Sequence, residues 1–300
     1  MISLNEIKGN FVGLFDSGFG GISVLNSAIK LIPNENFVYF ADSENFPYGK
    51  KSKDDLTAIG QNIISKFYKY SPKCLIIACG TMSTSNPKKL REPFKDLNII
   101  GTYPNFWQIF KPGLVLENHH FSYSDKNGIN ASRDILKILI LSTTATSNSV
   151  FLKEKIKLYD SLALIYNEPA DGIVKAVEND MIDSPELKDY LSNLLKPYVN
   201  FDYIVLGCTH FPFAKNVIKK IVSTNTNIIS GCEVSAKECY EYMKSNNLLN
   251  EELSSSTFST QKTPIIQVID AKSTEKRKET FMRLLDTNGQ KYDISFGDCI

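Results

Sequence analysis

Two cysteines stand at the ends of two apolar runs of the same pattern, far apart in the chain. The runs are Cys74–Cys79 and Tyr203–Cys208, and in each a small residue precedes the final cysteine, with a threonine one or two places later. Short runs rich in β-branched residues predict buried parallel strands. Because open α/β sheets bind ligands beyond the carboxyl ends of their strands, we expect Cys79 and Cys208 at a substrate. Two thiols from two similar halves predict an acid and a base that face each other across one carbon.

A glycine-rich turn, Asp16–Gly21, follows the first apolar run and opens an amphipathic stretch. Glycines let a backbone turn tightly and approach a ligand, and free amides at a helix start favour an anion such as a carboxylate. It is not a dinucleotide fingerprint, because Ser23 stands where GxGxxG has its third glycine. An ordinary strand-to-helix turn is the alternative. An acid among such amides instead favours a site, in which Asp16 binds an ammonium or orients a base.

Two further side chains qualify as partners of the thiols. His210 is the one histidine of three that stands at a predicted strand end beside a candidate thiol, although a core histidine is the alternative. Glu178 lies on a predicted helix, and by itself it is most simply a solvated carboxylate. A helix start and a neighbouring imidazole both lower a thiol pKa, so both Cys79 and Cys208 are expected to be reactive.

Other candidates are less specific. Thr143 and Thr146 follow a predicted strand as helix caps or as ligand contacts, and Phe46–Gly49 is either a turn or a carboxylate contact. Four more thiols are expected to be inert, as buried cysteines commonly are: Cys74, Cys232, Cys239 and Cys299.

The composition is that of an ordinary globular protein of 300 residues, with 42% hydrophobic and 22% charged residues. A formal net charge of +1 makes no electrostatic case for nucleic acid or a membrane surface, so neither is expected as a partner. No apolar run approaches the ~18 residues of a membrane span, and the N-terminus lacks a signal-peptide pattern. A cytoplasmic location with reduced thiols is expected. Metal-ligand spacing is absent, since no CxxC pair occurs and His119 and His120 are the only adjacent histidines.

Apolar runs alternate with amphipathic stretches along the chain, which predicts an α/β protein with mostly parallel sheets. Predicted strands are Phe11–Phe15, Phe37–Ala41, Cys74–Cys79, Ile99–Thr102, Ile135–Leu141, Leu162–Tyr166, Tyr203–Cys208, Ile228–Ser230 and Ile265–Ile269. The segment 119–133 is interpreted as a surface insertion and 253–263 as a loop. Crossings at Gly101–Pro104 and Phe211–Phe213 predict a first domain of residues 1–103 plus 216–300 and a second of 104–215.

Taken together, these residues resemble the glutamate racemase family, within the aspartate/glutamate racemase superfamily. The motifs that carry the resemblance follow one another over most of the chain: Asp16–Gly21, Ala41-Asp42, Pro47–Gly49, Ala78–Thr81, Ser142–Ser149 and Gly207–Pro212. The resemblance implies two α/β domains of pseudo-twofold relation, an active-site cleft between them and no cofactor. It also implies racemisation of L- and D-glutamate by two cysteines acting as two bases, which supplies D-glutamate for peptidoglycan synthesis.

Site residues follow from the resemblance position by position. The catalytic set is Cys79, Cys208, Asp16, His210 and Glu178, with Cys79 on the D-face and Cys208 on the L-face. The substrate-binding set is Asp16, Ser17, Tyr48, Gly49, Gly80, Thr81, Thr143, Thr209 and His210. The chain departs from the family at Gly80, where an asparagine is common, at Gly101–Pro104, and before Glu178, where a Cys-Pro pair is missing.

Alternatives to a glutamate racemase stay open at this point. One is a racemase for aspartate or another amino acid, since Gly80 removes a side chain that holds substrate. Another is a cysteine-dependent amidase or hydrolase with Cys208 as nucleophile and His210 as base, which leaves Cys79 without a role. A third is an amino-acid-binding protein without activity. The expected partner is a small amino acid, and a homodimer is left open.

Overall fold

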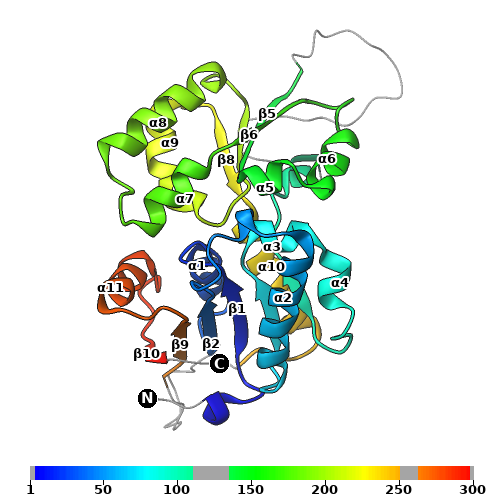
Figure 1. The fold of residues 1–300 in the computed structure, drawn as a ribbon, viewed down its shortest axis with the longest axis vertical. Helices are drawn as coiled ribbons and strands as arrows, with labels where there is room; N and C mark the ends of the chain where they lie inside the picture. The colour runs from blue at the N-terminus through cyan, green and yellow to red at the C-terminus, as the bar shows by residue number, and fades with distance from the viewer. Residues whose placement is uncertain (1–3, 111–134, 251–262, 298–300) are drawn as a thin grey trace, which may run out of the picture.

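The computed structural model describes residues 4–110, 135–250 and 263–297, and its strands form two sheets (Figure 1). The larger has the order β10-β9-β2-β1-β3-β4 and the smaller the order β6-β5-β7-β8, and every described pairing is parallel. The strands are β1 (Val12–Asp16), β2 (Phe37–Ala41), β3 (Cys74–Ile77), β4 (Ile99–Gly101), β5 (Lys137–Ser142), β6 (Leu164–Pro169), β7 (Tyr203–Leu206), β8 (Asn227–Ser230), β9 (Ile265–Asp270) and β10 (Asp293–Gly297).

The two sheets share one strand order. β2-β1-β3-β4 in the larger sheet corresponds to β6-β5-β7-β8 in the smaller, so in each the first strand lies between the second and the third. Cys79 follows the third strand of the first set, and Cys208 follows the third strand of the second. The equivalent placement of two cysteines in two equivalent sheets agrees with the pseudo-twofold relation that the resemblance implies.

All nine predicted strands are present in the two sheets, with ends that lie within three residues of the predicted ones. β1, β2 and β3 are buried along their whole length, as expected of parallel strands covered on both faces. β10 was not predicted. Its five residues, Asp293–Gly297, are partly exposed at the edge of the larger sheet and include only two large apolar side chains, so its pattern is weak.

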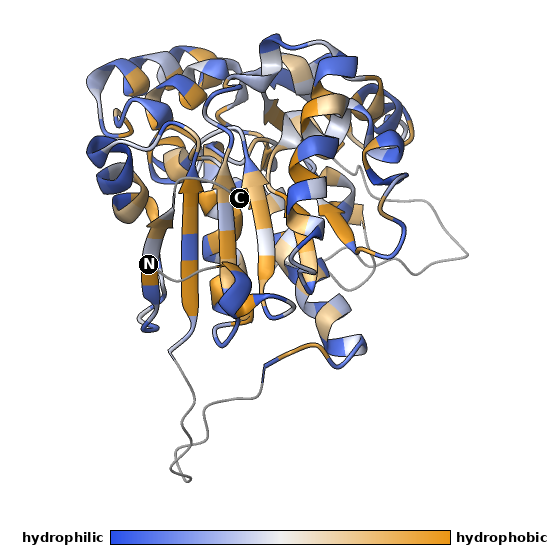
Figure 2. Cartoon of the chain, turned by 60° about the horizontal axis from the view of Figure 1, so that its bottom comes forward, coloured by the Kyte–Doolittle hydropathy of each residue, from blue (hydrophilic) through white to orange (hydrophobic). Residues whose placement is uncertain are grey.

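Helices cover the sheets on both faces. Figure 2 shows the strands of the larger sheet mostly in the hydrophobic colour, while the helices around them carry both colours. The described residues contain eleven α-helices. They are α1 (Ile22–Leu31), α2 (Lys53–Tyr68), α3 (Gly80–Ser85), α4 (Pro87–Arg91), α5 (Thr144–Ser147), α6 (Val150–Lys157), α7 (Asp171–Glu178), α8 (Pro185–Leu195), α9 (Lys215–Ile221), α10 (Gly231–Ser245) and α11 (Glu275–Leu284).

Alternate residues of β1 enter different cores, because successive side chains of a strand point to opposite faces of the sheet. Val12 and Leu14 join the core with α1 and α10, whereas Phe11, just before the strand, and Phe15 join the core with α2. The apolar residues of α2 between positions 56 and 67 recur with the period of a helix, and most of them are buried against the sheet. The central strands are thereby held from both sides, and their carboxyl ends are rigid supports for a site.

The two crossings between the sheets lie side by side. One leaves β4 at Gly101, and the other passes from β8 into α10. Ser235 of α10 donates a hydrogen bond to the Gly101 carbonyl at 3.3 Å, and its hydroxyl lies 3.1 Å from that of Thr102. Gly231, the first residue of α10, lies against the Tyr103 carbonyl, where a Cβ would overlap that carbonyl.

The domain limits stay a prediction, and the strand pairing favours a later return than the one at Phe211–Phe213. After that segment the chain continues into α9 and then β8, which pairs with β7 of the smaller sheet. The pairing therefore assigns residues up to Ser230 to the second unit, beyond the predicted limit of 215. The predicted insertion at 119–133 and most of the predicted loop at 253–263 lie outside the described residues. Within the described residues, no helix has the length and apolar character needed to cross a membrane.

Candidate active site

The two cysteines singled out in the sequence lie in equivalent turns after β3 and β7. Both are buried, with 6% of Cys79 and 8% of Cys208 exposed. The two turns meet, because a Cβ on Gly80, the residue after Cys79, would lie 3.0 Å from the carbonyl oxygen of Gly207, the residue before Cys208, so the two thiols belong to one site. The site lies between the carboxyl ends of strands from the two sheets, as the sequence predicts.

On the Cys208 side, three side chains form a connected series. The Cys208 sulfur lies 3.7 Å from Nδ1 of His210, and Nε2 of His210 lies 2.7 Å from Oε1 of Glu178. The same carboxylate oxygen accepts a hydrogen bond of 2.7 Å from the Phe19 amide. Glu178 is the last residue of α7, and His210 directly precedes the 3-10 helix η5 (Phe211–Ala214). The structure thus brings Glu178, which sequence alone treats as a solvated carboxylate, to the imidazole.

The protonation of His210 and Glu178 follows from the contacts of these two side chains. Burial alone lowers the pKa of His210, but the bonds to Cys208 and Glu178 and their negative charges raise it well above its usual value. Burial raises the pKa of Glu178, but the hydrogen bond and charge of His210, the Phe19 amide and the charge of Arg277 outweigh it and lower the pKa. The pair is therefore an imidazolium and a carboxylate, which puts a positive charge and an N–H donor beside the Cys208 sulfur.

We expect Glu178→Gln to destabilise the fold mainly at weakly acidic pH. The contribution of Glu178 to the free energy of unfolding is complete above its usual pKa of 4.5. It is lost as the pH falls through the lower pKa that Glu178 has in the folded state. The contribution of His210 is complete below 6.5 and is lost as pH rises through its higher folded value. Both are complete between pH 4.5 and 6.5, where breaking a buried pair should cost about 3 kcal/mol of unfolding free energy.

Urea unfolding of wild type and Glu178→Gln at acidic, weakly acidic and alkaline pH measures this difference. Glu279→Gln, on α11 and outside the site, is the control and should show no such maximum. A difference that is constant with pH would show that Glu178 and His210 are not an ion pair.

On the Cys79 side, the partner is Asp16, the last residue of β1. Asp16 is fully buried, its Oδ2 accepts a hydrogen bond of 2.8 Å from the Gly21 amide, and its charge acts on the Cys79 thiol. Burial and then the charge of Asp16 raise the pKa of the Cys79 thiol well above its usual value, against the lowering effect of the Met82 amide. The expectation of a lowered pKa for Cys79 is therefore wrong, because burial and a neighbouring carboxylate outweigh the helix start.

The glycines of the Asp16–Gly21 turn make room for two side chains of the Cys208 series. A Cβ on Gly18 would overlap the carboxylate of Glu178, and a Cβ on Gly20 would overlap Nδ1 of His210. Two amides of the turn are already occupied, since Gly21 donates to Asp16 and Phe19 donates to Glu178. The turn therefore places the two supporting carboxylates, and the amides of Phe19 and Gly21 are not free for a substrate.

The remaining candidates surround the thiols. Tyr48, which opens the 3-10 helix η2 (Tyr48–Lys50), is buried and donates a hydrogen bond of 2.7 Å to Asp42, and Cys79 is among the groups that raise its pKa. The hydroxyls of Thr81 and Thr143, from opposite sheets, lie 3.1 Å apart. The rest of the set lies in the same turns: Ser17 and Thr209 are buried beside Asp16 and Cys208, Gly80 follows Cys79, and Gly49 follows Tyr48.

A cavity of about 520 Å³ opens next to this site and reaches Thr81. It lies between the start of α2 and helices α3 to α6, and its lining includes Lys51, Lys53 and Lys88. The lining has three cationic side chains against one carboxylate, that of Glu154, which favours a small anion. Among the described residues, no three side chains of His, Cys, Asp or Glu are arranged to hold a metal ion.

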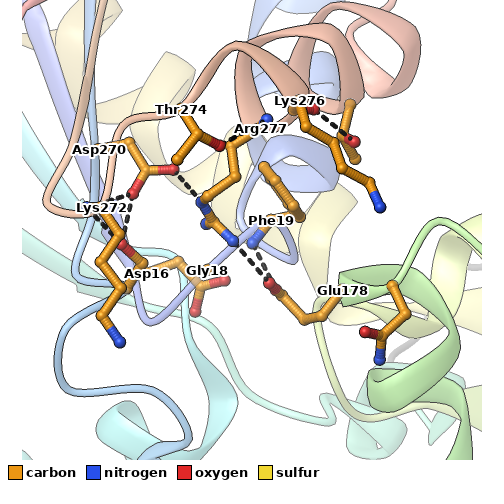
Figure 3. Close-up of polar contacts among 12 residues, drawn as sticks. Asp16, Gly18, Phe19, Glu178, Asp270, Lys272, Thr274, Lys276 and Arg277 are labelled. Carbon is orange, nitrogen blue, oxygen red and sulfur yellow. Dashed lines mark hydrogen bonds and ion pairs between the residues drawn. The ribbon is translucent and has the colours of Figure 1, made fainter.

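Two charged residues near the site were missed by sequence reasoning. Nη1 of Arg277, on α11, lies 3.6 Å from Oε2 of Glu178, and its Nε donates to Asp270 at the end of β9 (Figure 3). Asp270 has a local signal, because it directly follows a predicted strand as Asp16 does. Arg277 has none, since it lies within the alternating charges of 275–279, which are typical of a solvated helix face.

The buried free thiols outside the site agree with their predicted class. Cys74, Cys232 and Cys239 are all buried, and the Cys239 thiol donates a hydrogen bond of 3.7 Å to the Met243 sulfur inside the core. Burial is also the main reason why the pKa of Cys232 rises to about 11. Cys299 lies outside the described residues.

Comparison with known proteins decides the family. No family model matches the chain. A glutamate racemase of Clostridium perfringens is 32% identical over 249 residues, which cover 82% of this chain and 88% of the relative. One of Clostridium acetobutylicum is 33% identical over 247 residues, with shares of 82% and 88%. The chain belongs to the glutamate racemase family. The resemblance inferred from the motifs is thereby confirmed. Glutamate racemases are isomerases.

Solved glutamate racemases share the fold. The structure of isoform RacE1 from Bacillus anthracis has a TM-score of 0.76 and 22% identity, covering 97% of this chain and 98% of that one. The glutamate racemase of Francisella tularensis in complex with D-glutamate has a TM-score of 0.73 and 22% identity, covering 96% and 98%. The predicted α/β architecture with two mostly parallel sheets is thereby confirmed as the glutamate racemase fold.

Proposed function

We propose that this chain interconverts L- and D-glutamate without a cofactor, with Cys79 and Cys208 exchanging the Cα proton on opposite faces. The observation that carries the proposal is the pair of buried thiols at equivalent strand ends of two equivalent sheets. Each thiol has its own neighbouring charged groups. The Asp16 carboxylate lies near Cys79, and the pair of His210 and Glu178 lies next to Cys208. A racemase needs two such groups, because the proton leaves one face of the carbon and returns to the other.

The protonation states suit one direction of this reaction. The His210 imidazolium places a positive charge and an N–H group 3.7 Å from the Cys208 sulfur, while burial and the charge of Asp16 keep Cys79 protonated. The Cys208 thiolate then takes the Cα proton from one face, and the Cys79 thiol gives its proton to the other. The resemblance assigns Cys208 to the L-face, so this direction of the proposed reaction starts from L-glutamate. After turnover the thiol and thiolate are exchanged, and the site is ready for D-glutamate.

The bases alone do not account for the reaction. A well-placed general base typically contributes about 10²–10⁴-fold, whereas the Cα–H of an amino acid is a very weak acid. The rest must come from donors around the carboxylate, where charge builds up as the carbanion forms. The turns that carry Ser17, Gly49, Gly80, Thr81 and Thr209 are the proposed donors.

The proposed activity is tested with purified protein and each enantiomer of glutamate. Circular dichroism should decay to zero from either side, and aspartate should be a poor substrate. Added chelator should have no effect, and no pyridoxal absorbance should be present. Activity that depends on an added metal or pyridoxal phosphate, or the absence of any activity with glutamate, would contradict the proposal.

Gly80 bears on how the substrate is bound. A Cβ at this position would lie 3.0 Å from the carbonyl oxygen of Gly207, the residue before Cys208. The glycine therefore lets the two cysteine turns approach each other, and an asparagine would push them apart. We expect Gly80→Asn to lower kcat/KM for glutamate about tenfold, since small misplacements of reacting groups are costly.

Steady-state kinetics of Gly80→Asn and Gly80→Ala separate crowding from hydrogen bonding. Both variants add the same Cβ, but only asparagine adds an amide. Crowding predicts similar losses in the two variants. A lower KM for Gly80→Asn than for wild type would show instead that the chain has lost a binding group with no replacement.

We also propose that the D-glutamate made here supplies peptidoglycan synthesis, as the family resemblance implies. Expression of the chain in a bacterium that requires D-glutamate should restore growth without the supplement. Growth restored equally by a Cys79→Ser variant would contradict this role.

A further inference from the structure

The C-terminal helix α11 reaches the proposed active site from the side of the larger sheet. Its residue Arg277 forms an ion pair with Glu178 of α7, which covers the smaller sheet. Asp270, at the end of β9, accepts a hydrogen bond from Nε of Arg277. Figure 3 shows the Arg277 side chain extended between Asp270 and Glu178, with Phe19 beside it. One arginine thus joins elements of both sheets next to the catalytic histidine.

Arg277 is held from several directions. The ring of Phe19 lies against its guanidinium, 4.2 Å from ring centroid to Cζ, and only 21% of the side chain is exposed. Asp270 is itself fixed, because it accepts hydrogen bonds from the Ser43 hydroxyl and the Lys272 amide. A planar guanidinium binds two carboxylates in defined directions, whereas a lysine ammonium has no such fork. The position of Nη1 at Glu178 is therefore determined by Asp270 and Phe19.

The same contacts hold the Glu178 carboxylate against Nε2 of His210. Oε1 of Glu178 accepts a hydrogen bond from the Phe19 amide and contacts Nε2 of His210. Oε2 of Glu178 forms the ion pair with Arg277. Phe19 contributes twice, with its amide to Glu178 and its ring to Arg277. The contacts described for Arg277 lead to Asp270, Glu178 and Phe19, and none leads to Cys79 or Asp16. The arrangement supports one half of the site only.

We propose that Arg277 and Asp270 are positioning residues for the Cys208 half of the site, which hold Glu178 against His210 and so orient the imidazole toward Cys208. The proposal rests on the proposed two-thiol racemisation. Neither residue touches the reacting atoms. Their removal should weaken proton transfer at Cys208 and leave proton transfer at Cys79 nearly unchanged.

A reaction that needs only one base separates the two halves. With β-chloroglutamate, a thiolate takes the Cα proton, the electron pair forms a Cα–Cβ double bond, and chloride leaves. The enamine takes up water and yields 2-oxoglutarate and ammonia. Cys79→Ser and Cys208→Ser establish which enantiomer each thiol deprotonates. Racemisation of glutamate itself uses both thiols in either direction and does not make this distinction.

For Arg277→Met we expect the elimination that depends on Cys208 to fall about tenfold or more, as for loss of a charged contact, and the other to change less than about twofold. Arg277→Lys keeps the charge without the fork and should recover only part of the loss. Asp270→Asn should likewise slow the elimination that depends on Cys208 and leave the elimination that depends on Cys79 nearly unchanged. The matched control is Arg283→Met on the same helix, which breaks a pair with Asp180 and should leave both eliminations unchanged.

A second readout does not require activity. The Nε2 proton that His210 shares with Glu178 should give a downfield proton NMR signal, assigned by its loss in His210→Gln. We expect the signal to broaden or vanish in Arg277→Met and to persist in Arg283→Met. Wild type without racemisation or elimination would overturn the proposed function, and the NMR comparison would still test the position of Glu178. An unchanged signal, or equal losses for both enantiomers, would overturn the inference about Arg277.

Discussion

Replacing either proposed catalytic thiol by serine, as Cys79→Ser or Cys208→Ser, is expected to lower racemisation of glutamate about 10³-fold or more. A serine hydroxyl keeps the size of the side chain but holds its proton too tightly to act as the base. Each variant should still eliminate chloride from one enantiomer of β-chloroglutamate, because the other thiol remains. The two variants should retain opposite enantiomers, which is measured by ammonia release from each enantiomer separately.

The control for both variants is Cys74→Ser. Cys74 is a buried thiol of β3, the strand that precedes Cys79, and it lies in the same core as Cys239. Its replacement should leave racemisation nearly unchanged. Retention of the same enantiomer by Cys79→Ser and Cys208→Ser would contradict the assignment of one thiol to each face.

The second large effect is expected from Gly20→Ala, which changes no functional group. The added methyl would overlap Nδ1 of His210 and crowd the hydroxyl of Thr209. An imidazole ring moves as a rigid unit, so relief of the overlap should carry Nδ1 away from the Cys208 sulfur. We expect kcat/KM for glutamate to fall about 10²-fold, the size expected for misplacing a group that assists proton transfer.

The control for this variant is Ser27→Ala. Ser27 lies on α1 and donates to the Ser23 carbonyl one turn earlier, outside the proposed site. Urea unfolding should show that Gly20→Ala stays folded under assay conditions. A Gly20→Ala enzyme with wild-type activity would show that the imidazole has room to move without loss of function, and that its present position is not required.

The strand ends were accessible to sequence reasoning because local patterns determine them. Buried strands of a parallel sheet appear as continuous apolar runs, so β3 and β7 were found, and with them Cys79 and Cys208. The same logic placed Asp16 at the end of β1. Because parallel strands of one open sheet present their carboxyl ends at the same edge, Asp16 and Cys79 were expected together. That Cys208 joins them from the other sheet depends on how the two sheets pack.

The supporting contacts were not accessible in the same way, because they join residues that are distant in the sequence. The Phe19 amide meets Glu178 across 159 positions, and His210 meets it across 32. Nothing in the neighbourhood of Glu178 or Arg277 distinguishes either residue from a solvated charge on a helix. The later return between the sheets that the strand pairing favours has a related reason, since only the pairing shows that β8 belongs with β7.

The sequence by itself determined the alternation of strands and helices, the two cysteines at equivalent strand ends, and the family motifs. These features depend on residue type and spacing over short stretches. Only the tertiary structure decided the protonation pattern, because burial and the charge of a neighbour set it: Cys79 lies buried beside Asp16, whereas His210 is paired with Glu178. It also decided that Gly18 and Gly20 accommodate Glu178 and His210, and that Arg277 reaches the site, since each depends on how two sheets pack together.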